Sequence, residues 1–258
     1  MKRVIFHLGF QKTATTSFQA LLDANRPRLD LGIYAYGRDT QPLRALALSI
    51  AHNPTPVALR SFSYAMSGCF QEIMKNGHEY TIISDENMVG RTLYNREGNL
   101  ASWSETILPL IAKALPDDLS AEIIFYTRDH AAWLHGQCVK RARERRGYVK
   151  WIEDCPIDTR WDALHDTMAR AASPIPVRFV AMEDDLRRDG FVGGTVLRTA
   201  GVSDQLIADL QIPEPQSRAL HKASLGLLRG LNHVPMPLRR RLQISEAIER
   251  FDNRVRAR

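Results

Sequence analysis

Four short apolar runs, each nearly unbroken and rich in β-branched and aromatic residues, stand out along the first 180 residues of the chain. Runs of this kind are typical of strands that are buried on both faces of a parallel sheet. The pattern therefore predicts strands at Arg3–Leu8, Tyr80–Ser84, Glu122–Thr127 and Val177–Val180.

Amphipathic stretches of helical length separate these runs. Strands that alternate with helices imply right-handed crossovers, so we expect a three-layer α/β/α fold around a central parallel sheet. The predicted helices are Thr15–Ala24, Pro56–Lys75, Trp103–Ala114 and Ala131–Arg145.

After Val180 the hydrophobic pattern becomes helical. Proline-containing pieces separate the predicted helices, because proline blocks the continuation of a helix. We find no internal repeat, low-complexity tract or dividing linker, so we expect a single domain over residues 1–258, with about 190–258 as a mostly helical cover. These helices are predicted at Gly190–Ala200, Gln216–Leu231 and Pro237–Val255.

The composition, with 44% hydrophobic and 25% charged residues, is that of an ordinary soluble globular protein. No window approaches eighteen consecutive apolar residues, so we expect no stable membrane insertion. The N-terminal Met1-Lys-Arg runs at once into the first strand, and Gly9 interrupts any signal-peptide core. We therefore expect a cytoplasmic protein.

Cysteine and charge narrow the classes of chemistry. Cys69, Cys138 and Cys155 are scattered and odd in number, which fits reduced thiols, and no C-x-x-C or H-x-x-x-H spacing indicates a metal site. The formal charge of +6 favours acidic partners, either nucleic acid or a phosphorylated cofactor. Charge alone does not choose between them.

The segment 9–17, directly after the first predicted strand, combines a glycine, a lysine and four hydroxyl-bearing residues. Ligands of such sheets bind beyond the carboxyl ends of the strands. A helix that begins around Ala14 or Thr15 would aim its free N–H groups and its positive dipole end at this loop, and Lys12 adds a charge. The simpler alternative, a helix capped by Thr13 or Thr15, explains one hydroxyl only. The segment therefore predicts an anion-binding site.

The same segment resembles the phosphosulfate-binding loop of bacterial sulfotransferases, which use 3′-phosphoadenosine 5′-phosphosulfate. It reads H-x-G-x-x-K-T-x-T-T-S, with Ala14 where that family has glycine, a change that helical φ/ψ would tolerate. The ATP- and GTP-binding pattern G-x-x-x-x-G-K-[ST] does not fit, because Gln11 precedes the lysine. The resemblance implies that the cosubstrate is bound by Gly9, Gln11, Lys12, Thr13, Ala14, Thr15, Thr16 and Ser17.

The run 123–134 resembles the second cofactor element of that family, in which a strand ends in an arginine and the next helix carries a serine eight residues later. The resemblance implies that Arg128 and position 136 hold the 3′-phosphate, and the planar guanidinium of an arginine suits phosphate oxygens. Gly136 stands in place of the serine, which removes one hydroxyl contact. The alternative for Arg128 is a surface arginine at a strand end.

A third part of the resemblance is the strand that ends in Ser84-Asp85-Glu86, since a similar strand of the bacterial sulfotransferases ends in Ser-x-Glu. It implies that Glu86 is the base that accepts the proton of the acceptor. Two alternatives stay open: a magnesium site of the Walker B type, and structural pairing with a helix N-terminus or Lys12. His7 is a weaker candidate base, and we expect it to be buried and hydrogen-bonded.

Other segments carry looser indications. The stretch 218–232 loosely resembles a helical segment near the end of bacterial sulfotransferase-like proteins, and the basic run 140–146 is expected to be a solvated helix face or to lie over the cofactor phosphates. We expect Gly37–Met74 and Tyr148–Arg160 to build the acceptor pocket.

The sequence thus favours a sulfotransferase that moves a sulfuryl group to a hydroxyl or amine acceptor, with no metal and with Lys12 stabilising the bridging oxygen. Its enzymatic rival is a P-loop kinase or nucleotide hydrolase, which needs Asp85 and Glu86 on magnesium. Its non-enzymatic rival is a relative that binds a nucleotide or acidic partner without turnover. A nucleic-acid module ranks third, because no recognised binding motif accompanies the basic residues. The acceptor and the oligomeric state do not follow from the sequence.

Overall fold

The computed structural model describes residues 1–35, 39–89, 102–133, 136, 161–214, 221–231 and 233–256. The chain forms two compact units, which we describe separately. The first comprises Met1–Asn95, Asn99–Asp129 and Asp158–Gln216, and the second comprises Arg96–Gly98, His130–Ile157 and Ser217–Arg258. The single domain over the whole chain stays a prediction.

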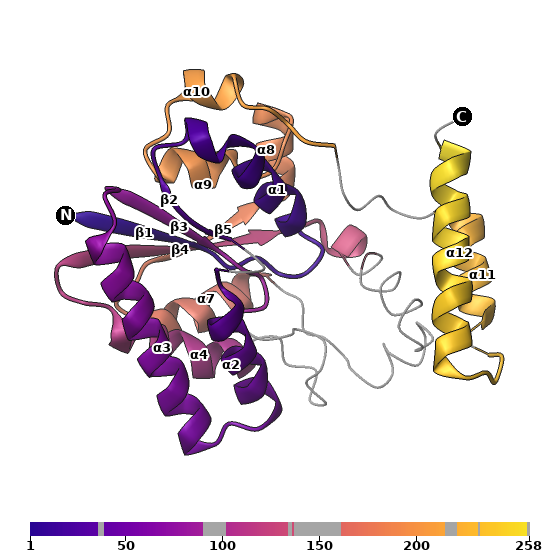
Figure 1. Ribbon diagram of the computed structural model, residues 1–258, viewed down its shortest axis with the longest axis horizontal. Coiled ribbons are helices and arrows are strands. Elements are labelled where there is room, and N and C mark those ends of the chain that lie inside the picture. Colours follow the sequence, from indigo (N-terminus) through magenta and orange to yellow (C-terminus); the bar gives the residue numbers. More distant parts are fainter. Residues whose placement is uncertain are drawn as a thin grey trace. The chain divides into compact units, whose positions relative to one another are not determined.

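A five-stranded parallel sheet forms the centre of the first unit (Figure 1). The strand order is β2-β3-β1-β4-β5, so β1 is the central strand and lies between β3 and β4. The α/β prediction is confirmed. The hydrophobic pattern does not predict β2, because this strand has only four residues and begins with a glycine. The strands are β1 (Lys2–His7), β2 (Gly32–Ala35), β3 (Tyr80–Ser84), β4 (Leu119–Thr127) and β5 (Val177–Ala181).

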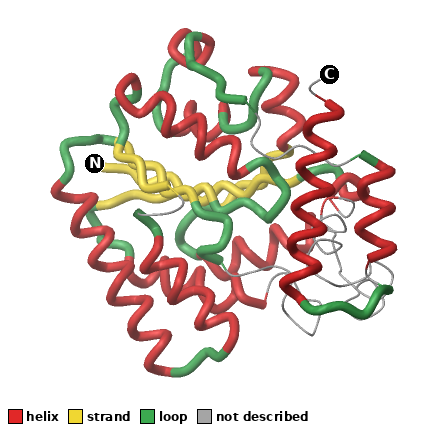
Figure 2. The backbone as a smooth tube through the Cα atoms, turned by 45° about the vertical axis from the view of Figure 1, so that its right-hand side comes forward, coloured by secondary structure: helices red, strands yellow, loops and turns green. Residues whose placement is uncertain are grey.

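Helices cover both faces of this sheet, which gives three layers (Figure 2). One face carries α1 (Thr15–Asn25), the short helix η1 (Arg26–Arg28), α8 (Met182–Asp189), α9 (Gly194–Thr199) and α10 (Asp204–Ala208). The other face carries α2 (Gln41–His52), α3 (Pro56–Lys75), α4 (Ser102–Ala114) and α7 (Trp161–Ala172).

The helix predictions hold in part. Helix α3 has the predicted bounds, and α1 and α4 differ from theirs by one residue at one end. The hydrophobic pattern does not predict α2 and α7, and the stretch predicted as one helix at 190–200 contains the shorter α9. Of the predicted helix 131–145, the described residues 131–133 and 136 are helical, and the others lie outside the described residues.

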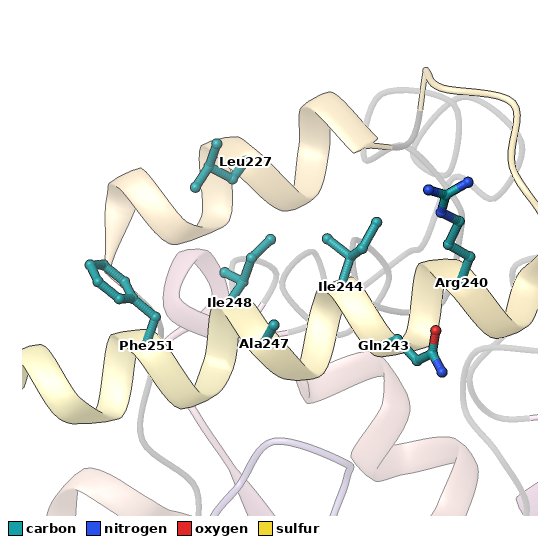
Figure 3. A pocket seen from close by; sticks show the side chains of 7 residues that line it. All are labelled: Leu227, Arg240, Gln243, Ile244, Ala247, Ile248 and Phe251. Atoms are coloured by element: carbon teal, nitrogen blue, oxygen red, sulfur yellow. The ribbon is translucent and has the colours of Figure 1, made fainter.

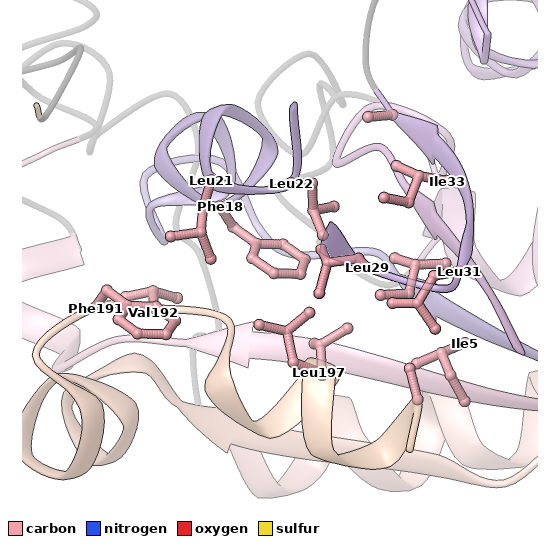
Figure 4. Packing of buried hydrophobic residues seen from close by; sticks show 14 of the residues in the cluster. Ile5, Phe18, Leu21, Leu22, Leu29, Leu31, Ile33, Phe191, Val192 and Leu197 are labelled. Atoms are coloured by element: carbon pink, nitrogen blue, oxygen red, sulfur yellow. The ribbon is translucent and has the colours of Figure 1, made fainter. Parts of the chain in front are cut away.

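The core between α1, α9 and the sheet consists mostly of aliphatic side chains, together with the rings of Phe18, Tyr126 and Phe191 (Figure 4). Phe18, Leu22 and Leu197 are fully buried there, and each such side chain contributes about 1.5–3 kcal/mol relative to exposure. Gly193, at the start of α9, has a φ of 119°, and a Cβ built on it would lie 2.0 Å from Cδ2 of Phe18. Only glycine therefore lets α9 pack this close to α1.

Asp185 fixes the connection between α8 and α9. Its buried carboxylate accepts hydrogen bonds from the Tyr126 hydroxyl, from the backbone N–H groups of Gly193 (2.9 Å) and Thr195 (3.1 Å), and from the Thr195 hydroxyl, and it pairs with Arg188. Burial and then the Asp185 charge raise the pKa of Tyr126, which therefore stays a donor. A buried carboxylate with this many donors is structural rather than reactive.

The second unit contains the helical hairpin α11 (Lys222–Leu231) and α12 (Leu238–Arg256). Helix α12 differs from its prediction by one residue at each end, whereas α11 begins at Lys222 and residues 216–220 of its prediction lie outside the described residues. Leu225 and Leu228 are buried, with Ile248 packed against them, and Asp252 accepts hydrogen bonds from the Ser224 hydroxyl and the His221 N–H. An open groove of about 480 Å³ on the hairpin is lined by Leu227, Arg240, Gln243, Ile244, Ala247, Ile248 and Phe251 (Figure 3). Within the described residues, no helix has both the length and the apolar character needed to cross a membrane.

Candidate anion-binding site

The three sequence segments with predicted chemistry meet at one edge of the sheet. Because β3 and β4 flank β1, the loop after β1, the turn after β3 and Arg128 after β4 are neighbours at the carboxyl ends of these strands. The Leu8 N–H donates to the Ile124 carbonyl (3.0 Å), and the Asp85 N–H donates to the His7 carbonyl (3.2 Å). This is the edge at which open α/β sheets bind their ligands.

The loop 8–14 between β1 and α1 has an unusual backbone. Lys12 has a φ of 75° and Ala14 a φ of 62°, both in the left-handed region. The condition under which the methyl group of Ala14 would be tolerated, helical φ/ψ, is therefore not met, and the left-handed conformation of this alanine costs about 1–2 kcal/mol. Left-handed residues interspersed in a turn direct successive N–H groups to one side, which is the geometry of anion-binding nests.

Helix α1 begins at Thr15, as predicted, but no side chain of the described residues caps it. The Thr13 hydroxyl donates instead to the Phe10 carbonyl (2.5 Å) and closes the loop on itself. The capping alternative is therefore wrong, and the first N–H groups of α1 have no partner within the helix. They add to the positive end of the helix dipole at the loop.

Polar side chains of the loop and of β1 surround Gly9 closely. A Cβ built on Gly9 would lie 2.9 Å from Thr13 Oγ1, 3.1 Å from Thr15 Oγ1 and 3.5 Å from His7 Nε2. Both Thr15 Oγ1 and His7 Nε2 are buried and have no hydrogen-bond partner among the residues that the structure describes. A buried polar atom left unsatisfied costs about 1–3 kcal/mol, and both of these atoms lie beside the anion-binding loop.

The aromatic side chain of Phe10 anchors the loop on β4 and β5. Its ring lies 5.6 Å from Phe125, 5.8 Å from Phe179 and 5.1 Å from Trp161, centroid to centroid. The Trp161 indole N–H donates to the Arg128 carbonyl (3.0 Å), so the same cluster also holds the backbone of the arginine predicted to bind phosphate. Sequence analysis missed this role of Phe10 and Trp161.

Arg128 turns back toward the loop. Its guanidinium lies 3.5 Å from the Lys12 carbonyl oxygen, and both side chains are half-buried. The structure thus brings the two predicted cationic residues together. Gly136 is helical but belongs to the second unit, and the basic run 140–146 lies outside the described residues.

Asp85 holds the turn after β3 together through contacts of its carboxylate within the chain. The buried Asp85 carboxylate accepts from the Thr40 hydroxyl (2.6 Å) and the Asn87 N–H (2.9 Å), and it pairs with Arg44 at 3.3 Å. Its charge is therefore already compensated by a cation of the chain, which argues against Asp85 as a magnesium ligand. The next residue, the half-buried Glu86, is presented by this turn.

One hydrogen bond links this turn to the anion-binding loop. Gln11 Nε2 donates to Asn87 Oδ1 at 2.9 Å, and both side chains are buried. Gln11 therefore uses its side chain to fix the loop beside Glu86. No sequence signal singles out Asn87, because its role depends on a partner 76 residues away.

No protein-family model and no curated protein matches this sequence. The fold is similar to that of a sulfotransferase from Alicyclobacillus acidocaldarius, with 14% sequence identity over 95% of each chain and a TM-score of 0.44. A likeness at this level defines neither activity nor substrate, so the function is argued from the residues of the site.

Proposed function

We propose that this protein is a sulfotransferase that moves the sulfuryl group of 3′-phosphoadenosine 5′-phosphosulfate to a hydroxyl or amine acceptor. The observation that carries the proposal is the backbone of the loop after β1, in which the left-handed residues Lys12 and Ala14 lead into a first turn of α1 that no side chain of the described residues caps. The H-x-G-x-x-K-T-x-T-T-S sequence of this loop supports the choice of a phosphosulfate over other anions.

The residues of the loop and of the neighbouring strand ends fit such a cosubstrate. The N–H groups of α1 and the hydroxyls of Thr15 and Thr16 hold the 5′-phosphate, and Arg128 binds the 3′-phosphate through its planar fork. Position 136, where the resemblance implies a serine, is Gly136 and offers no hydroxyl. The cosubstrate supplies an activated sulfuryl group whose leaving oxygen carries the developing negative charge.

Catalysis then rests on positioning and electrostatic stabilisation, as in the related phosphoryl transfers. Lys12 stabilises the bridging oxygen while the sulfur–oxygen bond to the nucleotide breaks and a bond forms between sulfur and the acceptor atom. Glu86 takes the proton that the acceptor loses. The first product is the sulfated acceptor, and the second is 3′-phosphoadenosine 5′-phosphate.

The kinase alternative is less well supported, because Arg44, Thr40 and Asn87 already engage the carboxylate of Asp85. The non-catalytic alternative is favoured by one observation, the left-handed Ala14 in place of glycine. A binding measurement followed by a turnover measurement separates the sulfotransferase from the kinase and from the non-catalytic alternative.

Calorimetric titration with 3′-phosphoadenosine 5′-phosphate in the absence of magnesium tests the site. We expect micromolar binding by the wild-type protein. Arg128→Ala should weaken it about 10–150-fold, the equivalent of 1.5–3 kcal/mol for a charge-assisted contact. Arg187→Ala is the matched control, since Arg187 is an exposed arginine of α8 that pairs with Asp184. Equal affinity of the Arg128 variant and the wild type would contradict the assignment, and binding of ATP with magnesium instead would favour the kinase.

Turnover then tests the chemistry. Lys12→Ala should lower the rate at which the cosubstrate loses its sulfuryl group by about 10²–10³, the usual effect of removing one preorganised donor. A change of less than threefold would remove Lys12 from the reaction, and a wild-type protein that binds the nucleotide without any transfer would support the non-catalytic alternative.

A further inference from the structure

Helix α12 of the second unit carries two separate stripes of side chains. One stripe faces α11 and holds the hairpin together: Asp252 accepts a hydrogen bond from the Ser224 hydroxyl, and the Arg241 guanidinium donates to the Leu231 carbonyl (2.9 Å). Two leucines of α11 form the buried apolar core of the hairpin among the residues that the structure describes. A pair of helices with so small a core buries little apolar surface by itself.

The second stripe of α12 lines the open groove on the hairpin. Its members recur at intervals of four, three and four residues, namely Arg240, Ile244, Ala247 and Phe251. This is the spacing by which a helix packs along another helix. Phe251 is 66% exposed, and Leu227 of α11, which borders the same groove, is 62% exposed. Large apolar side chains exposed at this spacing indicate a helical partner.

The two ends of the groove differ in chemistry. Ile244 and Ile248 project into the groove, with Phe251 at one end and Arg240 toward the other (Figure 3). Phe251 follows Arg240 by eleven residues, which span about 16 Å along a helix. A guanidinium attracts the face of an aromatic ring at close range. The groove therefore complements a copy of itself that runs in the opposite direction.

The antiparallel arrangement also matches the sizes of the side chains. When two helices with this spacing pack antiparallel, Arg240 lies opposite the partner's Phe251, and Ile244 lies opposite the partner's Ala247. Each large aliphatic side chain thus meets a small one, as interdigitated packing requires. A parallel copy would instead place arginine against arginine and phenylalanine against phenylalanine.

We infer that the hairpin of α11 and α12 pairs with the hairpin of a second copy of this chain, antiparallel about a two-fold axis, so that α12 of each copy lies in the groove of the other. Two paired hairpins form a four-helix bundle, in which amphipathic helices bury their apolar sides. Closed two-fold dimers are also the commonest protein oligomers. The pairing covers Leu227 and Phe251 of both copies, and the inference does not depend on the proposed activity.

Two other occupants suit the groove less well. An anionic membrane would attract the exposed arginines of α12, but Glu246 and Glu249 lie on the same helix, and a concave groove does not match a flat lipid surface. A small apolar ligand needs a pocket that encloses most of its surface, whereas this groove is open and leaves Phe251 two-thirds exposed.

Sedimentation velocity of the full-length chain at increasing protein concentration measures the association. We expect a wild-type dimer with a micromolar dissociation constant. Phe251→Lys should weaken it at least about 30-fold, the usual effect of losing a buried aromatic anchor. Leu242→Lys is the matched control, because Leu242 is an exposed apolar residue of α12 that does not line the groove, and it should dimerise as the wild type does. Both side chains are exposed, so circular dichroism should show both variants folded.

An exchange of charge tests the direction of pairing. Phe251→Lys alone places two cations against each other at both ends of an antiparallel pair. Adding Arg240→Glu turns each of these contacts into an ion pair, so the double variant should dimerise at least about 10-fold more tightly than Phe251→Lys, as close charge pairs across an interface do. In a parallel pair the same double variant would gather like charges and gain nothing.

Three results would contradict this arrangement. A wild-type protein that stays monomeric at every concentration would overturn the inference, including one that binds vesicles of anionic lipid as a monomer. Dimerisation that Phe251→Lys leaves unchanged, or that Leu242→Lys weakens equally, would overturn the assignment of the groove as the contact. A double variant that dimerises no more tightly than Phe251→Lys would overturn the antiparallel direction.

Discussion

A single methyl group on Gly9 should distort the anion-binding loop while the fold survives. Gly9 does not have a positive φ, so alanine suits its backbone, and the effect of Gly9→Ala is steric. The new Cβ would lie 2.9 Å from Thr13 Oγ1, closer than real Cβ contacts, and 3.1 Å from Thr15 Oγ1. The methyl group therefore displaces the hydroxyl of Thr13, which closes the anion-binding loop.

The size of the effect follows from what must move. Thr13 Oγ1 is held by its hydrogen bond to the Phe10 carbonyl, so displacing it gives up about 0.5–1.5 kcal/mol. Crowding adds about 1–3 kcal/mol, and the lower entropy of the unfolded alanine chain offsets about 0.4–1 kcal/mol. We expect a net loss of about 1–3 kcal/mol in the free energy of unfolding. Anion binding loses at least one charge-assisted hydrogen bond, which corresponds to a 10-fold or larger loss of affinity.

Urea unfolding measures the stability, and calorimetric titration with 3′-phosphoadenosine 5′-phosphate measures the affinity. Gly68→Ala is the matched control: a Cβ on Gly68, in α3, meets no atom of the described residues within 4 Å. This control should bind as the wild type does and gain up to about 1 kcal/mol, since alanine is the better helix former. Wild-type affinity of Gly9→Ala would refute the assignment of the loop as the binding site, and a variant that no longer folds would refute the steric estimate.

Three further predictions test the backbone and the buried histidine. Ala14→Gly should raise the free energy of unfolding by about 0.5–1 kcal/mol, because relief of the left-handed alanine outweighs the added entropy of the unfolded chain. A lower free energy of unfolding, measured with denaturant, would contradict strain at the φ of 62°. Gly193→Ala should cost at least about 3 kcal/mol, since its φ is 119° and its Cβ would overlap the Phe18 ring, and near wild-type stability would disprove this packing. The pKa of folded His7, about 3, lies below the ordinary 6.5, so its contribution to stability is full above pH 6.5 and is lost as the pH falls toward 3. Between pH 6.5 and 5 the free energy of unfolding of the wild type should therefore fall by about 2 kcal/mol more than that of His7→Gln. Parallel pH profiles of stability for the two proteins would contradict a lowered pKa of His7.

Hydrophobic periodicity along the chain determines much of this fold. Strands buried on both faces leave continuous apolar runs, and these runs predict four of the five strands of the sheet. The hydrophobic pattern does not predict β2, because a strand of only four residues that begins with glycine is too short to show a clear apolar run. The loop 9–17 is equally local: a glycine, a lysine and hydroxyls in a row, between a strand and a helix, identify it without knowledge of its neighbours.

The surroundings of this loop were decided only by the tertiary structure. The sequence shows that Ser84, Asp85 and Glu86 follow one another, but it does not show their different contacts. Ser84 hydrogen-bonds to His7, Asp85 pairs with Arg44, and Glu86 lies in the turn. Such roles depend on partners far along the chain, and a hydrophobic pattern records whether a position is buried, not which polar group it meets.

The left-handed backbone at Ala14 shows the same division. A residue's preference is local, and alanine prefers the right-handed helix, but loop closure by Thr13 and Phe10 together with the start of α1 imposes the opposite conformation. Sequence by itself thus determined the layers, most of the strands and the position of the anion-binding loop, because these features depend on which residues of a short segment are apolar, polar or charged. Tertiary structure decided the conformation of that loop and the partners of Ser84 and Asp85, because both are set by contacts between segments that only the folded sheet brings together.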